Sequence, residues 1–141
     1  MKNKIFITQA TDIGLLILRT GIGIMFILHG MPKLTGGPAT WDFLGAQMNI
    51  IGVGFGFTFW GFMAALSETL GGLLLIPGLF VRPAALLMLF TMIIAALMHL
   101  SSGDGLKGAS HAIEMGIVFL SVIFTGAGRY SLDRLIFYGK K

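Results

Sequence analysis

Histidine, lysine and glutamate residues interrupt the long apolar runs of this chain, and their side chains offer proton-transfer chemistry. His29, His99 and Glu114 lie within or at the end of such runs, and Lys33 follows His29 by about one helical turn. Histidine beside a carboxylate can exchange protons near neutral pH, and a ring N–H can donate to a quinone carbonyl. We therefore predict His29, Glu114 and His99 as catalytic residues, and His29 with Lys33 as quinone-binding residues. His111 sits beside a loop and is expected to be solvated.

Two further charged residues, Arg19 and Glu68, fall well inside apolar runs. If each run is an α-helix, Arg19 lies about 9 Å and Glu68 about 12 Å from the same end of the predicted bundle. An isolated charge inside a bilayer is costly, whereas a hydrogen-bonded pair of opposite charges is tolerated. We predict a structural ion pair between Arg19 and Glu68. The alternative is that Arg19 reaches the membrane interface, while Glu68 is protonated or bonded to a backbone carbonyl.

Three other chemistries fit the polar residues less well. His29 and His99 could ligate haem between two helices, but they form only one such pair, so haem is disfavoured. A metal site built from His99, Asp104 and His111 has no diagnostic spacing, and we predict no metal. Residues 103–108 match the pattern GxGxxG, but the dinucleotide fingerprint needs a preceding strand. Because this match joins two apolar runs, we interpret it as a flexible turn.

Composition places these residues in a membrane. The chain has 141 residues, of which 55% are hydrophobic and 11% charged, whereas charged residues make up roughly a quarter of soluble domains. A helix that crosses a bilayer needs about 20 mainly apolar residues. We predict an all-α membrane protein, a four-transmembrane-helix bundle that forms one domain over residues 1–141. The predicted spanning helices cover about residues 13–34, 55–76, 83–100 and 109–125.

Shorter segments flank and connect these runs. Residues 1–11 are predicted to be a polar lead, with Asp12 capping the first helix. After the first run, Trp41 to Met48 has an amphipathic pattern, which predicts a short helix in the membrane interface. The chain contains no cysteine, which excludes dithiol chemistry by its own side chains.

Basic residues near the ends of the runs predict the orientation of the bundle. The net charge is +4, and because the basic residues flank apolar runs, we expect them to meet lipid headgroups rather than nucleic acid. With both termini in the cytoplasm, only Lys33 and Lys107 lie on the outer side. Since positive charge favours the cytoplasmic side, we predict that both termini are cytoplasmic. The cytoplasmic set is then Lys2, Lys4, Arg82, Arg129, Arg134, Lys140 and Lys141.

Taken together, the motifs resemble the DoxX family of small four-helix membrane proteins. The resemblance covers about residues 13–134. It implies a multi-pass protein of the bacterial or archaeal cytoplasmic membrane with redox associations, since the family includes the membrane subunit of thiosulfate:quinone oxidoreductase. The matching residues are Arg19-x-Gly21-x-Gly23-x-x-Phe26-x-x-His29-Gly30-x-x-Lys33-Leu34, Glu68-x-x-Gly71-Gly72, Gly78-Leu79, Arg82-x-Ala84-Ala85, Met92, His99 and Gly126-x-Gly128-Arg129-Tyr130-Ser131-Leu132-Asp133.

These observations favour a quinone-linked subunit of a membrane oxidoreductase complex. The sequence leaves open whether the chain is itself an enzyme, and a partner would have to carry any sulfur chemistry because cysteine is absent. One alternative is a non-catalytic membrane scaffold or anchor for a partner protein. Another is a small-molecule or proton transporter, although Ile22 and Phe26 would interrupt its polar path. Besides the lipid bilayer, we expect a protein partner in a redox complex or a homo-oligomer.

Overall fold

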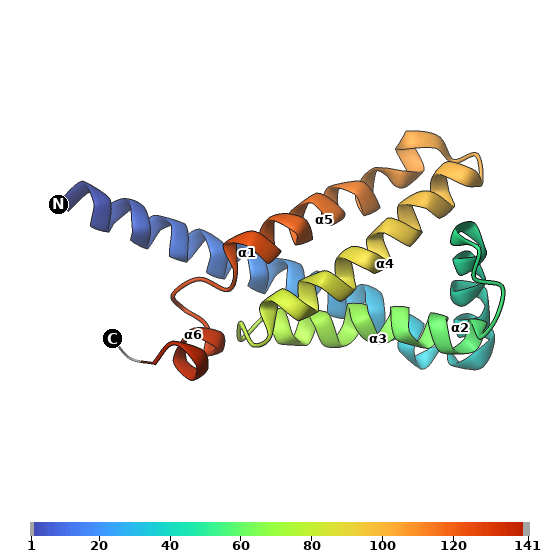
Figure 1. Cartoon of the computed structure of the whole chain (residues 1–141), viewed down its shortest axis with the longest axis horizontal. Helices are drawn as coiled ribbons and strands as arrows, with labels where there is room; N and C mark the ends of the chain where they lie inside the picture. The colour runs from blue at the N-terminus through green and yellow to red at the C-terminus, as the bar shows by residue number, and fades with distance from the viewer. Residues whose placement is uncertain (1, 140–141) are drawn as a thin grey trace.

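The fold is built entirely from helices in the part of the chain that the structure describes (Figure 1). The computed structural model describes residues 2–139, with side chains from Gln9 onward. The side chains of Lys2, Lys4, Lys140 and Lys141, which the charge argument places in the cytoplasm, therefore lie outside the described residues. The elements are α1 (Lys2–Thr35), α2 (Gly37–Gly45), the 3-10 helix η1 (Ala46–Ile51), α3 (Phe57–Leu75), α4 (Val81–Ser101), α5 (Gly105–Thr125) and α6 (Leu132–Phe137).

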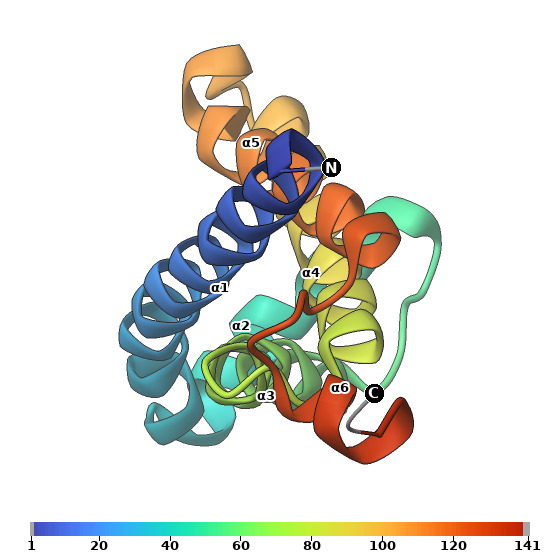
Figure 2. The same ribbon diagram turned by 90° about the vertical axis from the view of Figure 1, so that its left-hand side faces the viewer.

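Four of these helices are long and apolar enough to cross a membrane, which confirms the predicted all-α bundle. They alternate in direction, so that both termini lie at one end, which we call the termini end (Figures 1 and 2). The opposite end carries α2 and the loop between α4 and α5, and we call it the α2 end. The spans are Gln9–Thr35, Phe57–Leu75, Val81–Ser101 and Gly105–Thr125.

The first helix is longer than predicted. It begins at Lys2 rather than near residue 13, so the prediction of a polar lead ending in a cap at Asp12 is wrong. The physical reason is that residues 2–12 contain no glycine or proline to stop a helix. The Asp12 carboxylate instead accepts a hydrogen bond from the backbone N–H of Arg129, at 2.8 Å.

The predicted short helix after the first span is present as α2 followed by η1. Pro38 lies in the first turn of α2, where a missing N–H costs little. The indole N–H of Trp41 donates to the backbone carbonyl of Lys33 at 3.0 Å, which fixes the turn between α1 and α2. A Cβ added to Gly61 would lie 1.7 Å from the carbonyl oxygen of Trp41, so α2 packs directly onto the α3 backbone.

Glycines also bring α1 into backbone contact with α3. A Cβ at Gly23 would lie 2.7 Å from the carbonyl oxygen of Gly72, and one at Gly72 would lie 2.6 Å from that of Gly23. About two turns further along α1, a Cβ at Gly30 would lie 2.7 Å from the backbone nitrogen of Thr69. Small residues permit such close crossings of membrane helices. This crossing sets which side chains of α1 and α3 can meet.

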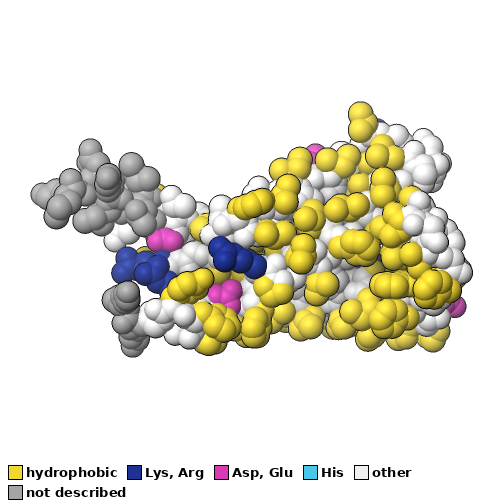
Figure 3. Space-filling view, in the orientation of Figure 1, with side chains coloured by type: hydrophobic (Ala, Val, Ile, Leu, Met, Phe, Trp, Pro, Cys, Tyr) yellow, Lys and Arg dark blue, Asp and Glu magenta, His cyan; other side chains and the backbone are white. Residues whose placement is uncertain are grey.

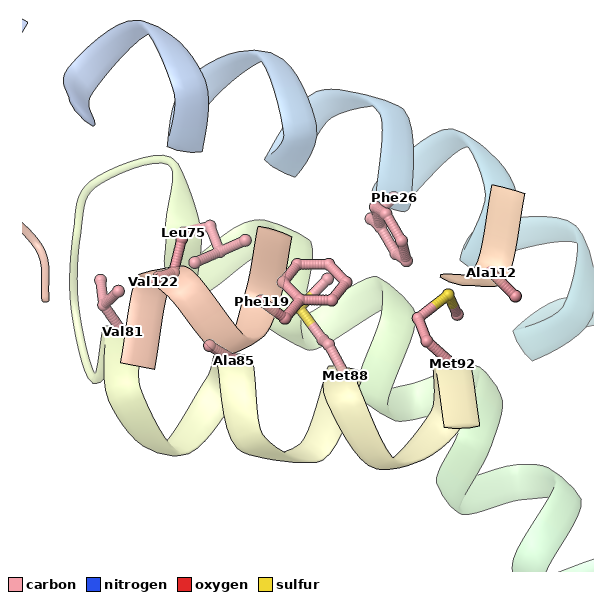
Figure 4. Packing of buried hydrophobic residues seen from close by; sticks show 9 residues of the cluster. All are labelled: Phe26, Leu75, Val81, Ala85, Met88, Met92, Ala112, Phe119 and Val122. Atoms are coloured by element: carbon pink, nitrogen blue, oxygen red, sulfur yellow. The ribbon is translucent and has the colours of Figure 1, made fainter. Parts of the chain in front are cut away.

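The apolar core occupies the space between the four spans (Figure 4). Phe26 of α1 and Phe119 of α5 meet edge to face, with ring centroids 5.0 Å apart. Met88 of α4 and Leu75 of α3 are fully buried against them. The outer surface is also largely hydrophobic, and on the face that Figure 3 shows, the charged side chains gather toward the termini end. A surface of this kind fits a lipid environment.

The C-terminal segment is tied to the termini end of the bundle. Ser131 caps α6 by accepting a hydrogen bond from the N–H of Arg134. The Asp133 carboxylate accepts from the backbone N–H groups of Phe80 (2.7 Å) and Val81 (3.0 Å), which lie at the start of α4. These N–H groups have no partner within their own helix, so a side-chain carboxylate stabilises that helix end.

We predict that Gly23→Ala lowers the free energy of unfolding by about 1–3 kcal/mol, because the added methyl group meets a backbone oxygen that cannot move aside. Gly21→Ala is the matched control, since a Cβ at that position of the same helix meets nothing within 4 Å. The measurement is helix loss on heating or denaturant titration in detergent micelles. Equal stability of the two variants would show that the α1–α3 crossing does not depend on close backbone contact.

Candidate functional site

A hollow of about 170 Å³ lies between α1, α3, α4 and α5 near the α2 end. Its apolar lining includes Phe26 and Met92, which separate it from the termini end of the bundle. All three histidines of the chain line this hollow, although they come from three different helices. Its polar lining consists of His29, Lys33, Glu68, His99 and His111.

The strongest electrostatic contact of the hollow joins Lys33 to Glu68. The ammonium of Lys33 lies 2.8 Å from Oε1 and 2.7 Å from Oε2 of Glu68. The Glu68 side chain is only 4% exposed, whereas that of Lys33 is 37% exposed. The buried carboxylate is therefore neutralised by a cation that approaches from the membrane-interface side.

The predicted ion pair between Arg19 and Glu68 is wrong. Within the described side chains, Glu68 pairs with Lys33 and not with Arg19. The depth estimate behind that prediction failed because α1 starts near Lys2, so Arg19 lies further from the start of its helix than assumed. The crossing of α1 over α3 then brings the end of α1, rather than its middle, to Glu68.

Arg19 instead binds backbone carbonyls at the termini end. Its Nη1 donates to the carbonyl oxygens of Leu75 (3.0 Å) and Ile76 (2.5 Å), where α3 ends. Its Nη2 donates to the carbonyl of Tyr130 in the C-terminal segment. Leu75 lies seven residues from Glu68, about 10 Å along the helix, which is too far for an ion pair. The carbonyls at a helix end carry partial negative charge and bind the guanidinium directly, and the charge of the nearby Asp133 adds an attraction.

The histidines fall into two contacts around the hollow. The rings of His29 and His111 lie 5.9 Å apart, centroid to centroid, and approach from α1 and α5. Nδ1 of His99 lies 2.7 Å from Oδ2 of Asp104. His111 is exposed, as its position beside the loop predicted, but it also lines the hollow. Sequence reasoning therefore missed its place in the site.

Asp104 orients the His99 ring. The hydrogen bond with His99, together with one from Ser102, holds the pKa of the Asp104 carboxyl below its ordinary value. An ionised carboxylate can only accept hydrogen bonds, so the proton of this contact belongs on Nδ1 of His99. The other ring nitrogen is then free to exchange a proton.

Glu114 lies apart from this site. The buried face of α5 carries Ala109, Ala112 and Phe119, whereas Glu114 is exposed and does not line the hollow. Glu114, predicted as a catalytic residue together with His29 and His99, therefore does not share the hollow with them. The reason is that α5 packs through its small and apolar residues. Both these residues and the polar residues recur at helical spacing, so the spacing alone does not show which set faces inward.

The site offers hydrogen-bond donors and titratable groups rather than a metal centre. Within the described side chains, no group of three His, Asp or Glu residues lies close enough to hold a metal ion. What the geometry assembles is a set of imidazole rings beside a fixed ion pair, in a hollow bordered by membrane-spanning helices. The predicted site residues His29, His99 and Lys33 are thus brought together.

The fold and the site define a class, the multi-pass α-helical membrane proteins with a small polar site near one end of the bundle. Within that class, the chain belongs to the DoxX family, whose model matches residues 14–100. It is 34% identical over 131 residues to the inner membrane protein YqjF of Escherichia coli (strain K12), covering 89% of this chain and 93% of the relative. No solved structure matches the chain.

A second relative carries a functional name. The chain is 29% identical over 133 residues to a protein of Bacillus subtilis (strain 168) named "Putative oxidoreductase CatD", with 94% of each chain covered. It is also 29% identical over 136 residues to the inner membrane protein YphA of Escherichia coli (strain K12), covering 89% of this chain and 91% of the relative. The chain is thus a multi-pass membrane protein, and two of its relatives are named as inner membrane proteins of a bacterium.

We predict that the two partners of the ion pair respond unequally to removal. Lys33→Met leaves a buried carboxylate without its cation and lowers the free energy of unfolding by about 3 kcal/mol. Glu68→Gln leaves a lysine whose ammonium reaches the membrane interface, and it lowers the free energy of unfolding by about 1 kcal/mol. Denaturant titration of the micelle-embedded protein measures both values.

Lys107→Met is the matched control for this prediction, because Lys107 is an exposed lysine at the same end of the bundle. Its free energy of unfolding should stay within about 0.5 kcal/mol of the unmodified chain. A Glu68→Gln variant less stable than Lys33→Met would show that the lysine, and not the carboxylate, is the group that needs its partner.

Proposed function

We propose that this chain is a quinone-linked subunit of a membrane oxidoreductase complex, and that the hollow near the α2 end binds the quinone ring. The observation that carries the proposal is the convergence of His29, His99 and His111 on one hollow beside the Lys33–Glu68 ion pair. The name of the Bacillus subtilis relative supports an association with oxidation and reduction.

The size and lining of the hollow suit a ring head group. Ligand pockets commonly measure roughly 300–1,000 Å³, and this hollow of about 170 Å³ is smaller. A quinone ring with its tail left among the lipids fits such a space, whereas a haem macrocycle does not. The rings of His29 and His111 reach the hollow from different helices, so they can donate to the ring carbonyls from two sides.

A bound quinone supplies an acceptor for two electrons and two protons, and the chain's residues bind the ring and hold the protons. His29 and His111 orient the carbonyls by hydrogen bonding. His99, whose Nδ1 is held by Asp104, relays protons between the hollow and the loop at the α2 end. The apolar contact of Phe26 with Phe119 prevents proton exchange toward the termini end, which argues against a transport path across the bundle.

The distribution of basic residues supports a proposed orientation in which the site serves the outer face of the membrane. Arg82, Arg129 and Arg134 lie at the termini end, whereas Lys33 and Lys107 lie at the α2 end. Since positive charge favours the cytoplasmic side, the termini are cytoplasmic and the hollow faces the outer side. The chain is then a multi-pass protein whose quinone exchanges its protons outside the cytoplasm.

We predict that His29→Ala and His111→Ala each weaken binding of a short-tailed ubiquinone analogue about tenfold, the value of one lost hydrogen bond of about 1.4 kcal/mol. Quenching of tryptophan fluorescence measures the binding. Trp41 lies close enough to the hollow to respond, because its indole N–H donates to the carbonyl of Lys33, which lines the hollow. Thr35→Ala is the matched control, because its hydroxyl lies at the same helix end but bonds only to α1 carbonyls.

Two results would contradict this proposal. The first is a purified protein that carries no quinone in its lipid extract and whose fluorescence does not respond to the analogue; the chain would then act as a scaffold or anchor. The second is binding that His29→Ala, His111→Ala and Thr35→Ala leave equally strong, which would move the quinone away from the hollow.

A further inference from the structure

The exposed face of α5 carries a regular polar seam that neither the core nor the hollow uses. Its residues are spaced alternately three and four apart, and every one of them is exposed. This 3.5-residue repeat is the spacing with which two parallel helices wrap around each other in a left-handed pair. The seam consists of Lys107, Ser110, Glu114, Ile117, Ser121 and Phe124.

Glu114 makes this face unsuited to lipid. It lies nine residues from Gly105 and eleven from Thr125, so its Cα is about 13 Å from one end of the span and about 16 Å from the other. A glutamate side chain is too short to reach either interface from that depth. Within the described spans, Glu114 is the only exposed acidic residue. Carboxyl groups at this depth are costly unless a polar group binds them.

The exposed faces of the other spans are different in kind. Ile17 on α1 and Leu87 on α4 are 68% and 54% exposed, and their neighbours on those faces are mainly apolar, as lipid contact requires. On α5 the residues that flank Glu114 one turn or two turns away include Ser110 and Ser121, whose small side chains permit close approach of a second helix.

We propose that a second copy of this chain covers the seam, with the two α5 helices parallel and Glu114 of one copy hydrogen-bonded to Glu114 of the other. Two copies inserted in the same direction carry Glu114 at the same depth, so each carboxyl group meets its own counterpart. When one of the two is protonated, its O–H donates to the ionised oxygen of the other, and the pair shares one negative charge. No unrelated partner is guaranteed a polar group at that depth.

The pair of glutamates also fixes the register of the dimer. In the middle of the span Glu114 is the only ionisable position of the seam, and an alignment shifted by three or four residues would set it against Ile117 or Ser110 and lose the carboxyl pair. The inference stands independently of the proposed quinone site, because Glu114 does not line the hollow.

Disulfide trapping tests this inference directly, because the chain has no cysteine of its own. Ile117→Cys in native membranes should form, on mild oxidation, a covalent dimer of twice the 15.1 kDa chain mass. Ile17→Cys is the matched control, because it also replaces an exposed isoleucine. Ile17 is 68% exposed and Ile117 is 61% exposed, and each lies eight residues from the termini-end boundary of its span. The Ile17→Cys variant should give less than about a tenth of that dimer yield, since contacts of order 1–2 kcal/mol favour association through the seam over association through α1.

The role of Glu114 is tested in the Ile117→Cys background. Glu114→Gln keeps a group that donates and accepts, and should retain the cross-linked dimer, whereas Glu114→Leu should reduce its yield about tenfold. Ser121→Cys, one turn further along the seam, is a second reporter and should behave in the same way.

Three outcomes would overturn the inference. Equal cross-linking of Ile17→Cys and Ile117→Cys would show random collision. Absence of the dimer from both Ile117→Cys and Ser121→Cys, or a product of another mass, would show that lipid or a different protein covers the seam. Undiminished cross-linking in Glu114→Leu would show that the carboxyl pair does not hold the dimer.

Discussion

The bundle depends on neutralising one buried carboxylate. Glu68 has its side chain almost completely removed from solvent, and Lys33 supplies the cation. That pairing requires α1 to cross closely over α3, which the glycines at the crossing permit. It also requires α1 to end beside Lys33, where the Trp41 indole fixes the following turn. The polar character of the α2 end follows from this single pair.

The two ends of the bundle bind their charged side chains in different ways. At the α2 end, a carboxylate and an ammonium neutralise each other and leave a hollow in which imidazole rings gather. At the termini end, Arg19 and Asp133 are bound to backbone groups at helix ends, and the apolar core begins directly beyond them. The α2 end therefore gathers the imidazole rings, whereas the backbone contacts of the termini end hold the C-terminal segment against the spans.

Sequence patterns predicted the elements better than the contacts between them. Apolar runs long enough to span a bilayer identified all four spans, and the predicted site residues His29, His99 and Lys33 line one hollow. The pairing of Glu68 could not be predicted because it depends on the angle between α1 and α3 and on where α1 starts. Whether Glu114 faces the inside or the outside of the bundle could not be predicted, because the small residues and the polar residues of α5 both recur at helical spacing. Periodicity gives the faces of a helix, and only its neighbours decide which face turns inward.

The hydrogen bond from Arg19 to the carbonyl of Tyr130 spans 111 positions of the chain. Because Arg19 is synthesised 111 residues before Tyr130, its guanidinium lacks this acceptor while the residues between them are being made. A chain truncated before residue 130 would keep all four spans but lose one of the three backbone carbonyls that bind Arg19. The segment that follows the fourth span therefore holds the first helix at the termini end, through Tyr130 on Arg19 and through Arg129 on Asp12.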